Sequence, residues 1–286
     1  MSVTSTLASA RRTWSFATRL EAKRVQFALA RARGELPVVT YATWRTASTA
    51  VHHAIRASGR HACVKAHSLH GEAVPGTRPS VLHAASRRTH VGDWAVHRHV
   101  LAARRCADWV VMVRDPLAMA LSASALAFRG GSHGGPTEAC LDRLLSATPV
   151  GGLDRWLEHD MRPALGWSAL DVPFDRDRGW TETEFALGRV LVLRADVSDR
   201  QKGEALSRFL GTAVTVAPKN DSGSGGRGGV LSALYRRLES HPDLLAASIA
   251  QRSVRHFWHM DDLLKLREHR FAAAAASSDG LVAACR

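Results

Sequence analysis

Two short segments of this chain carry residues that suit the binding of an oxyanion. The first runs from Arg45 to Thr49 (Arg-Thr-Ala-Ser-Thr) and joins a β-rich run to a stretch of helix-forming composition. A strand–turn–helix of this kind directs backbone N–H groups and the positive end of the helix dipole at one point. The arginine and the hydroxyls add further donors for a phosphate or sulfate group. A helix simply capped by Thr or Ser is the other interpretation.

The second segment contains Arg114, Asp115 and Pro116, followed by Ser122. Asp115 is a favourable N-cap and Pro116 a favourable first helical residue, so Arg114 should end the strand before them. Ligands of open α/β sheets bind at the carboxyl ends of strands, which makes Arg114 a second candidate for an anion. A surface ion pair between Arg114 and Asp115 is the alternative.

A basic residue and a histidine lie between these segments, at Lys65 and His67. The period of a strand places both side chains on one face of the sheet, so both could reach the same site. His67, His70, His97 and Asp93 are the candidates for a general base.

The elements that would position these residues follow from apolar runs alternating with helix-forming stretches. Strands are predicted over 36–42, 61–66, 108–113 and 189–193, and helices over 47–58, 93–105, 116–128, 137–147 and 153–168. The nearly continuous apolar run at 108–113 is typical of a strand covered on both faces, as in a parallel sheet. The alternation predicts an α/β fold with a mainly parallel sheet.

The two ends of the chain differ from this central part. Residues 8–33 predict an amphipathic helix, so the chain divides into an N-terminal helix (1–34), a main domain (35–270) and an Ala-rich tail (271–286) expected to be frayed. Within the main domain, residues 217–229 form a Gly/Ser loop, one helix is expected from 231 to 238, and another from 243 to 267.

The composition bounds the class of protein. The 286 residues are 45% hydrophobic with a formal net charge of +13, which favours anionic ligands without selecting one. No signal peptide and no apolar run of about 18 residues is apparent, so a cytoplasmic protein without a transmembrane segment is expected. The four cysteines are far apart, which argues against a disulfide framework or a zinc site. The sequence gives no indication of the oligomeric state.

Together these segments resemble the sulfotransferases that use 3′-phosphoadenosine-5′-phosphosulfate (PAPS). Arg45–Thr49 is similar to the family's 5′-phosphosulfate loop, and Arg114 with Ser122 to its 3′-phosphate site. Lys65-Ala-His67 is similar to its Lys-x-His, whose histidine is the base. Segments at 156–160, 170–174, 179–180 and 190–194 resemble a sulfotransferase-like bacterial family of capsular polysaccharide synthesis proteins. The resemblance covers about residues 36–238 and implies the sulfotransferase fold, a P-loop-like three-layer sandwich with a central, mainly parallel sheet flanked by helices.

The resemblance also implies roles for individual residues. The 5′-phosphosulfate would be bound by the loop residues Arg45, Thr46, Ala47, Ser48 and Thr49. Arg45 and Lys65 would stabilise charge on the leaving oxygen, and His67 would accept the proton of the acceptor. Ala47 stands where the family has glycine, which requires a right-handed helical backbone at this position.

Further residues complete the expected donor site. Arg114 and Ser122 would bind the 3′-phosphate, and Lys219 and Arg227 are additional candidates for the same group. Trp44 is a candidate surface for stacking adenine, with a place in the core as the alternative. No metal is expected, because arginine and amides would take the part of Mg²⁺. The histidines in 97–99 and 256–259 are assigned to solvated or core positions rather than to a metal.

The acceptor implied by the resemblance is a carbohydrate or a small natural product with a hydroxyl or amine. Two alternatives remain open at this point: a P-loop-type kinase or nucleotide transferase, and a non-catalytic protein that binds anions or nucleic acid. The chain has no recognisable helix-turn-helix, zinc finger or RNA-binding motif, so nucleic acid is not an expected partner.

Overall fold

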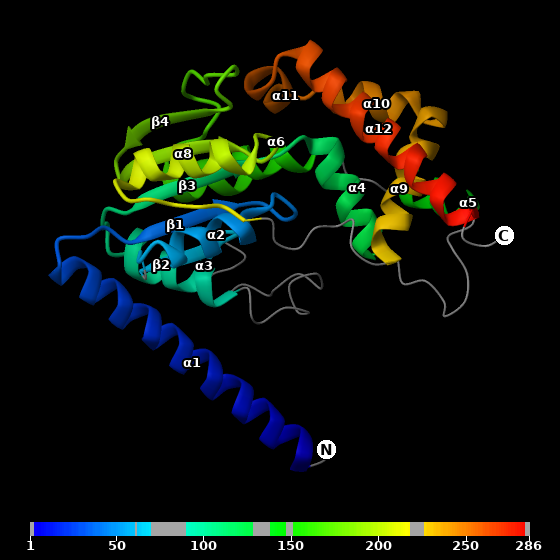
Figure 1. Ribbon diagram of the computed structural model, residues 1–286. Helices are drawn as coiled ribbons and strands as arrows, with labels where there is room; N and C mark the ends of the chain where they lie inside the picture. The colour runs from blue at the N-terminus through cyan, green and yellow to red at the C-terminus, as the bar shows by residue number, and fades with distance from the viewer. Residues whose placement is uncertain are drawn as a thin grey trace.

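The computed structural model describes residues 3–60, 62–69, 90–127, 138–146, 151–217 and 226–283. Its centre is a five-stranded sheet in the order β2-β1-β3-β5-β4 (Figure 1). The strands are β1 (Val38–Ala42), β2 (Cys63–Ala66), β3 (Asp108–Val113), β4 (Trp180–Phe185) and β5 (Gly188–Arg194). The first three and β5 pair in parallel, whereas β4 is antiparallel to β5. The α/β class and the mainly parallel sheet are therefore confirmed.

The central strands are apolar on both faces because helices cover both faces. Along β3, Trp109, Val111 and Val113 enter one core cluster, whereas Val110 and Met112 enter another. All six residues of β3 are buried. The edge strand β4 alternates between exposed and half-buried positions, and its sequence carries no apolar run, so it was not predicted.

Helices on the first face bury the larger cluster. They are α1 (Val3–Ala32), α3 (His90–Val96) with the π-helical turn η2 (His97–Leu101), the run α6 (Gly152–Trp156), η3 (Leu157–Met161) and α7 (Arg162–Leu165), and α11 (Arg252–Phe257). Helix α1 leaves the sheet and projects away from the rest of the chain (Figure 1). Phe27 anchors its C-terminal half in the core.

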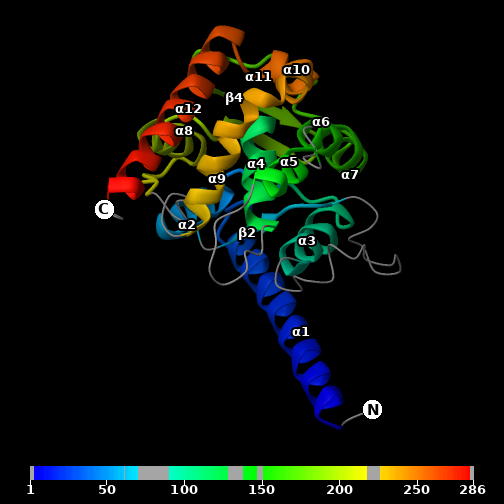
Figure 2. The same ribbon diagram turned by 90° about the vertical axis from the view of Figure 1, so that its right-hand side faces the viewer.

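The second face is covered by α2 (Ser48–Ala57) and α8 (Asp199–Leu210). A third cluster lies beyond the sheet, where α4 (Pro116–Ala127) packs with α5 (Glu138–Ser146) and α9 (Gly226–Arg237). Figure 2 shows these three helices together, with the last helix, α12 (Met260–Ala283), beside α9. The described chain is thus a sheet between two helical layers, with one helical group at its edge.

The C-terminal region differs from its prediction in two ways. The single helix expected over 243–267 is three helices: α10 (Pro242–Ile249), preceded by the 3₁₀ turn η4 (Leu238–Ser240), then α11 and α12. The chain is extended at Trp258, whose side chain is buried, so tertiary packing sets this break. The tail from 271, expected to be frayed, continues α12 as far as Ala283. Within the described residues, no helix has the length and apolar character needed to cross a bilayer.

Candidate functional site

The site is built where three neighbouring parallel strands end. β1 lies between β2 and β3, and in the register Tyr41 pairs with Ala66 and Ala42 pairs with Met112. The residues that follow these strands therefore emerge side by side at one edge of the sheet. This edge carries the loop 43–47 after β1, His67 after β2 and Arg114 after β3.

The loop between β1 and α2 has a strained backbone. Arg45 and Ala47 have positive φ angles, 66° and 57°. The expectation of a right-handed helical conformation at Ala47 is therefore wrong, because the loop turns through the left-handed region, which glycine would adopt freely. A left-handed alanine costs about 1–2 kcal/mol. Residues alternating with left-handed ones direct successive N–H groups into one concave surface, which suits an anion.

One hydrogen-bond donor of this loop is used within the loop, whereas the first amides of α2 have no acceptor inside the helix. The hydroxyl of the buried Thr46 donates to the carbonyl oxygen of Thr43 at 2.9 Å, so it braces the turn. Ala47 is the N-cap of α2 and offers no side-chain cap. The amides of Ser48 and Thr49 open that helix, where N–H groups have no acceptor inside the helix. These amides suit an anionic ligand.

The two predicted anion-binding corners are in direct contact. Arg114 Nη1 donates to the main-chain oxygen of Arg45 at 2.6 Å. Arg45 Nε donates in turn to Ser122 Oγ at 2.9 Å, and Ser122 is buried. The structure therefore brings together Arg45, Arg114 and Ser122, which the family resemblance relates to the two ends of one nucleotide. Burial lowers the pKa of Arg114, and the nearby charge of Arg270 adds to this effect.

The predicted alternative of a surface ion pair between Arg114 and Asp115 is wrong. The Asp115 carboxylate is buried and pairs with two arginines of α12: Arg267 Nη2 lies 2.8 Å and Arg270 Nη1 3.3 Å from its oxygens. It also accepts from the amide of Leu117 at 3.1 Å, which makes it the expected cap of α4. Arg267 and Arg270 were missed by the sequence analysis, because no local pattern links them to a residue about 150 positions away.

Lys65 contacts the start of α2, and His67 contacts the last residue of β1. Lys65 Nζ donates to Thr49 Oγ1 at 3.0 Å and so links β2 to the start of α2. Burial lowers the pKa of Lys65, and the charge of Asp93 opposes that shift. His67 Nδ1 lies 2.6 Å from the carbonyl oxygen of Ala42. A carbonyl only accepts, so Nδ1 carries the proton in neutral His67 and Nε2 is the basic nitrogen.

The His67 ring is stacked against Trp44. The ring centroids are 5.1 Å apart, and the planes differ by 16°. Burial lowers the pKa of His67 to about 4; the bond to Ala42 raises it, and the charge of Lys65 lowers it further. The imidazole is therefore neutral at physiological pH, which is the state a general base requires. Trp44 therefore lies directly beside this neutral imidazole.

The backbone around His67 is held from the first helical layer. Asp93 of α3 accepts from the His67 amide at 2.7 Å, and Trp156 Nε1 donates to the His67 carbonyl at 2.9 Å. Asp160 of η3 accepts from the Leu69 amide at 2.9 Å and from the hydroxyls of Tyr41 and Ser68. Burial raises the pKa of Asp93 to about 7, against bonds from two backbone amides. Asp93, a competing base in the sequence analysis, thus supports the backbone of the segment that carries His67.

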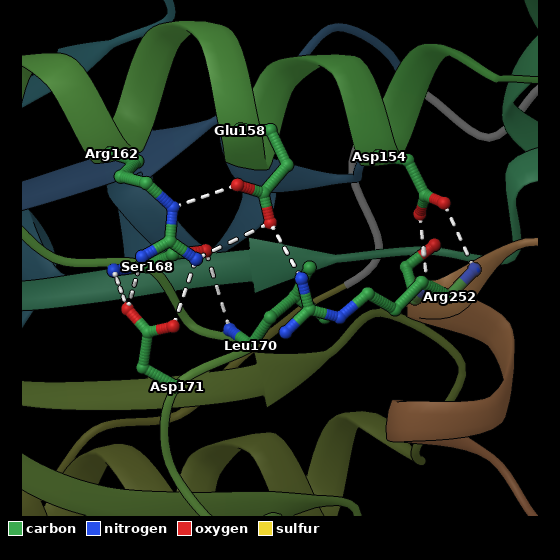
Figure 3. A network of polar contacts seen from close by, with 8 residues as sticks. Asp154, Glu158, Arg162, Ser168, Leu170, Asp171 and Arg252 are labelled. Atoms are coloured by element: carbon green, nitrogen blue, oxygen red, sulfur yellow. Dashed lines mark hydrogen bonds and ion pairs between the residues drawn. The ribbon is translucent and has the colours of Figure 1, made fainter.

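The helical run that supplies Trp156 and Asp160 is itself fixed by a polar network on its outer side (Figure 3). Arg162 binds Glu158 at 2.7 Å and Asp171 at 2.8 Å, and Arg252 of α11 reaches Glu158 at 3.1 Å. Asp154 accepts from the amides of Arg252 and Ser253 and so caps α11. Exposed ion pairs contribute little singly, but these share partners and therefore join α6–α7, the 168–171 turn and α11.

Several predicted residues are not placed at this edge. Lys219 and His70 lie outside the described residues. Arg227 lies in the first turn of α9, and its side chain is likewise outside the description. His97 belongs to η2, beyond Asp93 along the chain. Among the described residues, no group of three or more His, Cys, Asp or Glu side chains is arranged to hold a metal ion.

Comparison with known proteins gives no relative: no family model, no curated protein and no solved structure matches the chain. A function is therefore inferred from the residues and their geometry.

Proposed function

We propose that this chain is a PAPS-dependent sulfotransferase with the P-loop-like sulfotransferase fold. The observation that carries the proposal is the contact between the two strand-to-helix corners, in which Arg114 binds the main chain of Arg45 and Arg45 binds Ser122. A single nucleotide with phosphate groups at two positions would be held by corners that lie this close together. The second supporting observation is a neutral histidine at the end of the neighbouring strand.

The donor set matches the charge of such a nucleotide. Arg114 lies within reach of the charges of Arg45 and Arg270, and Lys65 lies at the start of α2, bonded to Thr49. Several cationic side chains therefore line this edge. Guanidinium groups bind phosphate and sulfate oxygens through pairs of parallel hydrogen bonds. Arg270 is a further donor on the side of Arg114, the position for which Lys219 and Arg227 were considered. The cationic side chains at this edge therefore suit the phosphate and sulfate groups of PAPS.

The proposed roles follow from these positions. When bound, PAPS supplies the sulfuryl group and a phosphate leaving group. The amides at the start of α2 and the Arg45 side chain bind the 5′-phosphosulfate, and Lys65, already bonded to Thr49, neutralises charge at the same place. Arg114 and Ser122 bind the 3′-phosphate. Fixed positive groups of this kind typically contribute about 10²–10³ in rate each.

His67 is the proposed general base. Its Nδ1 is bonded to Ala42, so Nε2 accepts the proton of the acceptor hydroxyl or amine. A folded pKa of about 4 makes it a weak but always available base at neutral pH, and it acts late, as charge develops on the acceptor oxygen. The acceptor is proposed to be a carbohydrate or a small natural product, and the site of transfer to be cytoplasmic.

Thermal-shift measurements with three nucleotides test the donor site. The product 3′-phosphoadenosine-5′-phosphate should raise the melting temperature clearly, whereas AMP and ATP should raise it much less, because they lack the 3′-phosphate. The titration is repeated at two salt concentrations to separate specific binding from general attraction to a basic protein. Equal shifts from all three nucleotides would overturn the assignment.

Metal dependence separates this proposal from a kinase. Sulfuryl transfer to a panel of phenols and sugars, followed with radiolabelled PAPS, should continue in EDTA. A kinase would instead lose its transfer from labelled ATP under the same treatment, because phosphoryl transfer requires Mg²⁺. Activity with ATP that EDTA abolishes would favour the kinase.

A further inference from the structure

Trp44 lies flat against the ring of the proposed base. The indole and imidazole centroids are 5.1 Å apart and nearly parallel, at 16°. The imidazole is tied at one edge by Nδ1 to Ala42, so it cannot rotate away without losing that bond. Trp44 itself is 47% exposed, which means that it can be replaced without opening the core.

In the part of the chain that the structure describes, the charged groups near His67 do little to stabilise its protonated form. Lys65, two residues earlier in the chain, repels a positive imidazole. The two nearby carboxylates are engaged with the backbone: Asp93 of α3 accepts from the His67 amide, and Asp160 of η3 binds Ser68 and Leu69. Among the described residues, the contacts found for the ring are the Ala42 carbonyl and the indole face.

An aromatic face attracts a cation that lies within about 6 Å of its centre, and tryptophan does so most strongly. The observed separation satisfies this limit. The attraction acts on the imidazolium and hardly at all on the neutral ring. An interaction that appears only as charge develops lowers the barrier rather than stabilising the resting state.

We propose that Trp44 is a positioning residue for His67, whose indole face stabilises the imidazolium formed when His67 accepts the acceptor's proton. The catalytic meaning of this inference rests on the proposed function. In that step the acceptor O–H bond breaks and its proton binds Nε2 of His67. The oxygen's electron pair forms the new O–S bond, while the S–O bond to the 5′-phosphate breaks and 3′-phosphoadenosine-5′-phosphate leaves. Trp44 thus serves the base rather than adenine.

The test compares Trp44→Leu with Trp44→Phe. Both variants keep an apolar side chain over His67, but only phenylalanine keeps an aromatic face. The pKa of His67 is followed by NMR titration of its Cε1–H, with the resonance identified by its loss in His67→Gln. The pKa in Trp44→Leu should lie about 0.4–1.5 pH units below that of the unsubstituted chain, with Trp44→Phe between them. A pKa in Trp44→Leu equal to or above that in Trp44→Phe would overturn the inference.

Hydrogen exchange at the same carbon gives a second measurement that needs no acid. This exchange proceeds through the imidazolium, so at neutral pH and resolved by mass spectrometry it should be about 2- to 30-fold slower in Trp44→Leu. Neither readout requires the nucleotide. Equal exchange rates in Trp44→Leu and Trp44→Phe, with nucleotide binding intact, would therefore overturn this inference and leave the proposed function standing. A pKa difference without nucleotide binding would instead remove the proposed function.

Discussion

The guanidinium of Arg114 donates a hydrogen bond to the carbonyl oxygen of Arg45, with 2.6 Å between Nη1 and O. This bond joins the end of β3 to the loop after β1 and holds a residue whose φ is 66°. A phosphate that binds here would meet a guanidinium that is already fixed, so little side-chain entropy would be lost on binding. One arginine therefore both shapes the loop and completes the proposed nucleotide site.

Replacing this guanidinium should affect one nucleotide selectively. Arg114→Gln should weaken binding of 3′-phosphoadenosine-5′-phosphate about 10- to 100-fold, because a hydrogen bond to a charged group contributes about 1.5–3 kcal/mol. Binding of AMP should change little. Isothermal titration calorimetry measures both, and Arg200→Gln on the exposed side of α8 is the matched control. Equal losses for the two nucleotides would mean that Arg114 only braces the loop.

The left-handed backbone of Ala47 gives a prediction about stability. Ala47→Gly should raise the free energy of unfolding by about 0.5–1 kcal/mol. Glycine adopts this conformation without strain, and the strain removed exceeds the destabilisation that comes from glycine's greater freedom in the unfolded chain. Ala50→Gly, within α2, should lower it by a similar amount. Urea unfolding of the two variants compares them directly. Destabilisation by both substitutions would show that the loop is not left-handed at Ala47.

Removal of the proposed base should separate catalysis from binding. His67→Gln should reduce sulfuryl transfer about 10²- to 10⁴-fold while leaving affinity for 3′-phosphoadenosine-5′-phosphate nearly unchanged. His97→Gln, which alters a competing base on η2, should retain full transfer. Transfer of radiolabelled sulfate and nucleotide titration provide the two measurements. Near-normal transfer by the first variant would assign the base elsewhere.

The pKa of Asp93, raised by burial to about 7, predicts a pH-dependent stability. The folded chain keeps this proton where an unfolded aspartate, with a pKa near 3.8, has lost it. The stabilisation is complete below about pH 3.8 and is lost as pH rises to about 7. The free energy of unfolding should therefore fall over this range relative to Asp93→Asn, by on the order of a few kcal/mol.

Urea unfolding between pH 4.5 and about 8 checks this prediction. His67 acts with the opposite sign, because its lowered pKa makes stability rise between about pH 4 and 6.5. Both chains contain His67, so its effect cancels in the comparison. Parallel stability curves for the two chains would contradict a raised pKa at Asp93.

The sequence predicted those parts of the fold whose signal is local. The run 108–113 is apolar at nearly every position and became β3 with the expected bounds, because a strand covered on both faces needs no polar side. The edge strand β4 was missed, since its pattern of Trp, Thr and Glu is typical of an exposed segment. The breaks between α10, α11 and α12 contain no proline or glycine, and the packing of Trp258 determines one of them.

The same distinction holds for the candidate site. Arg45 and Arg114 could be placed at strand ends from the pattern of elements, because parallel strands bring their carboxyl ends to one edge. Lys65, His67 and Ser122 were singled out mainly by the family resemblance. The left-handed turn at Ala47 could not be predicted, because alanine ordinarily favours the right-handed region. Nor could the pairing of Asp115 with Arg267 and Arg270, since a contact over such a separation leaves no pattern in the sequence.

Synthesis of the chain proceeds from its N-terminus, and this gives the Asp115 contact a consequence for folding. The strands β1, β2 and β3 leave the ribosome long before α12, which supplies both arginines bound to the carboxylate. An unpaired buried carboxylate costs several kcal/mol. A nascent or prematurely terminated chain that ends before Met260 would therefore hold this corner open to water. The proposed nucleotide site would close only once the last helix has docked.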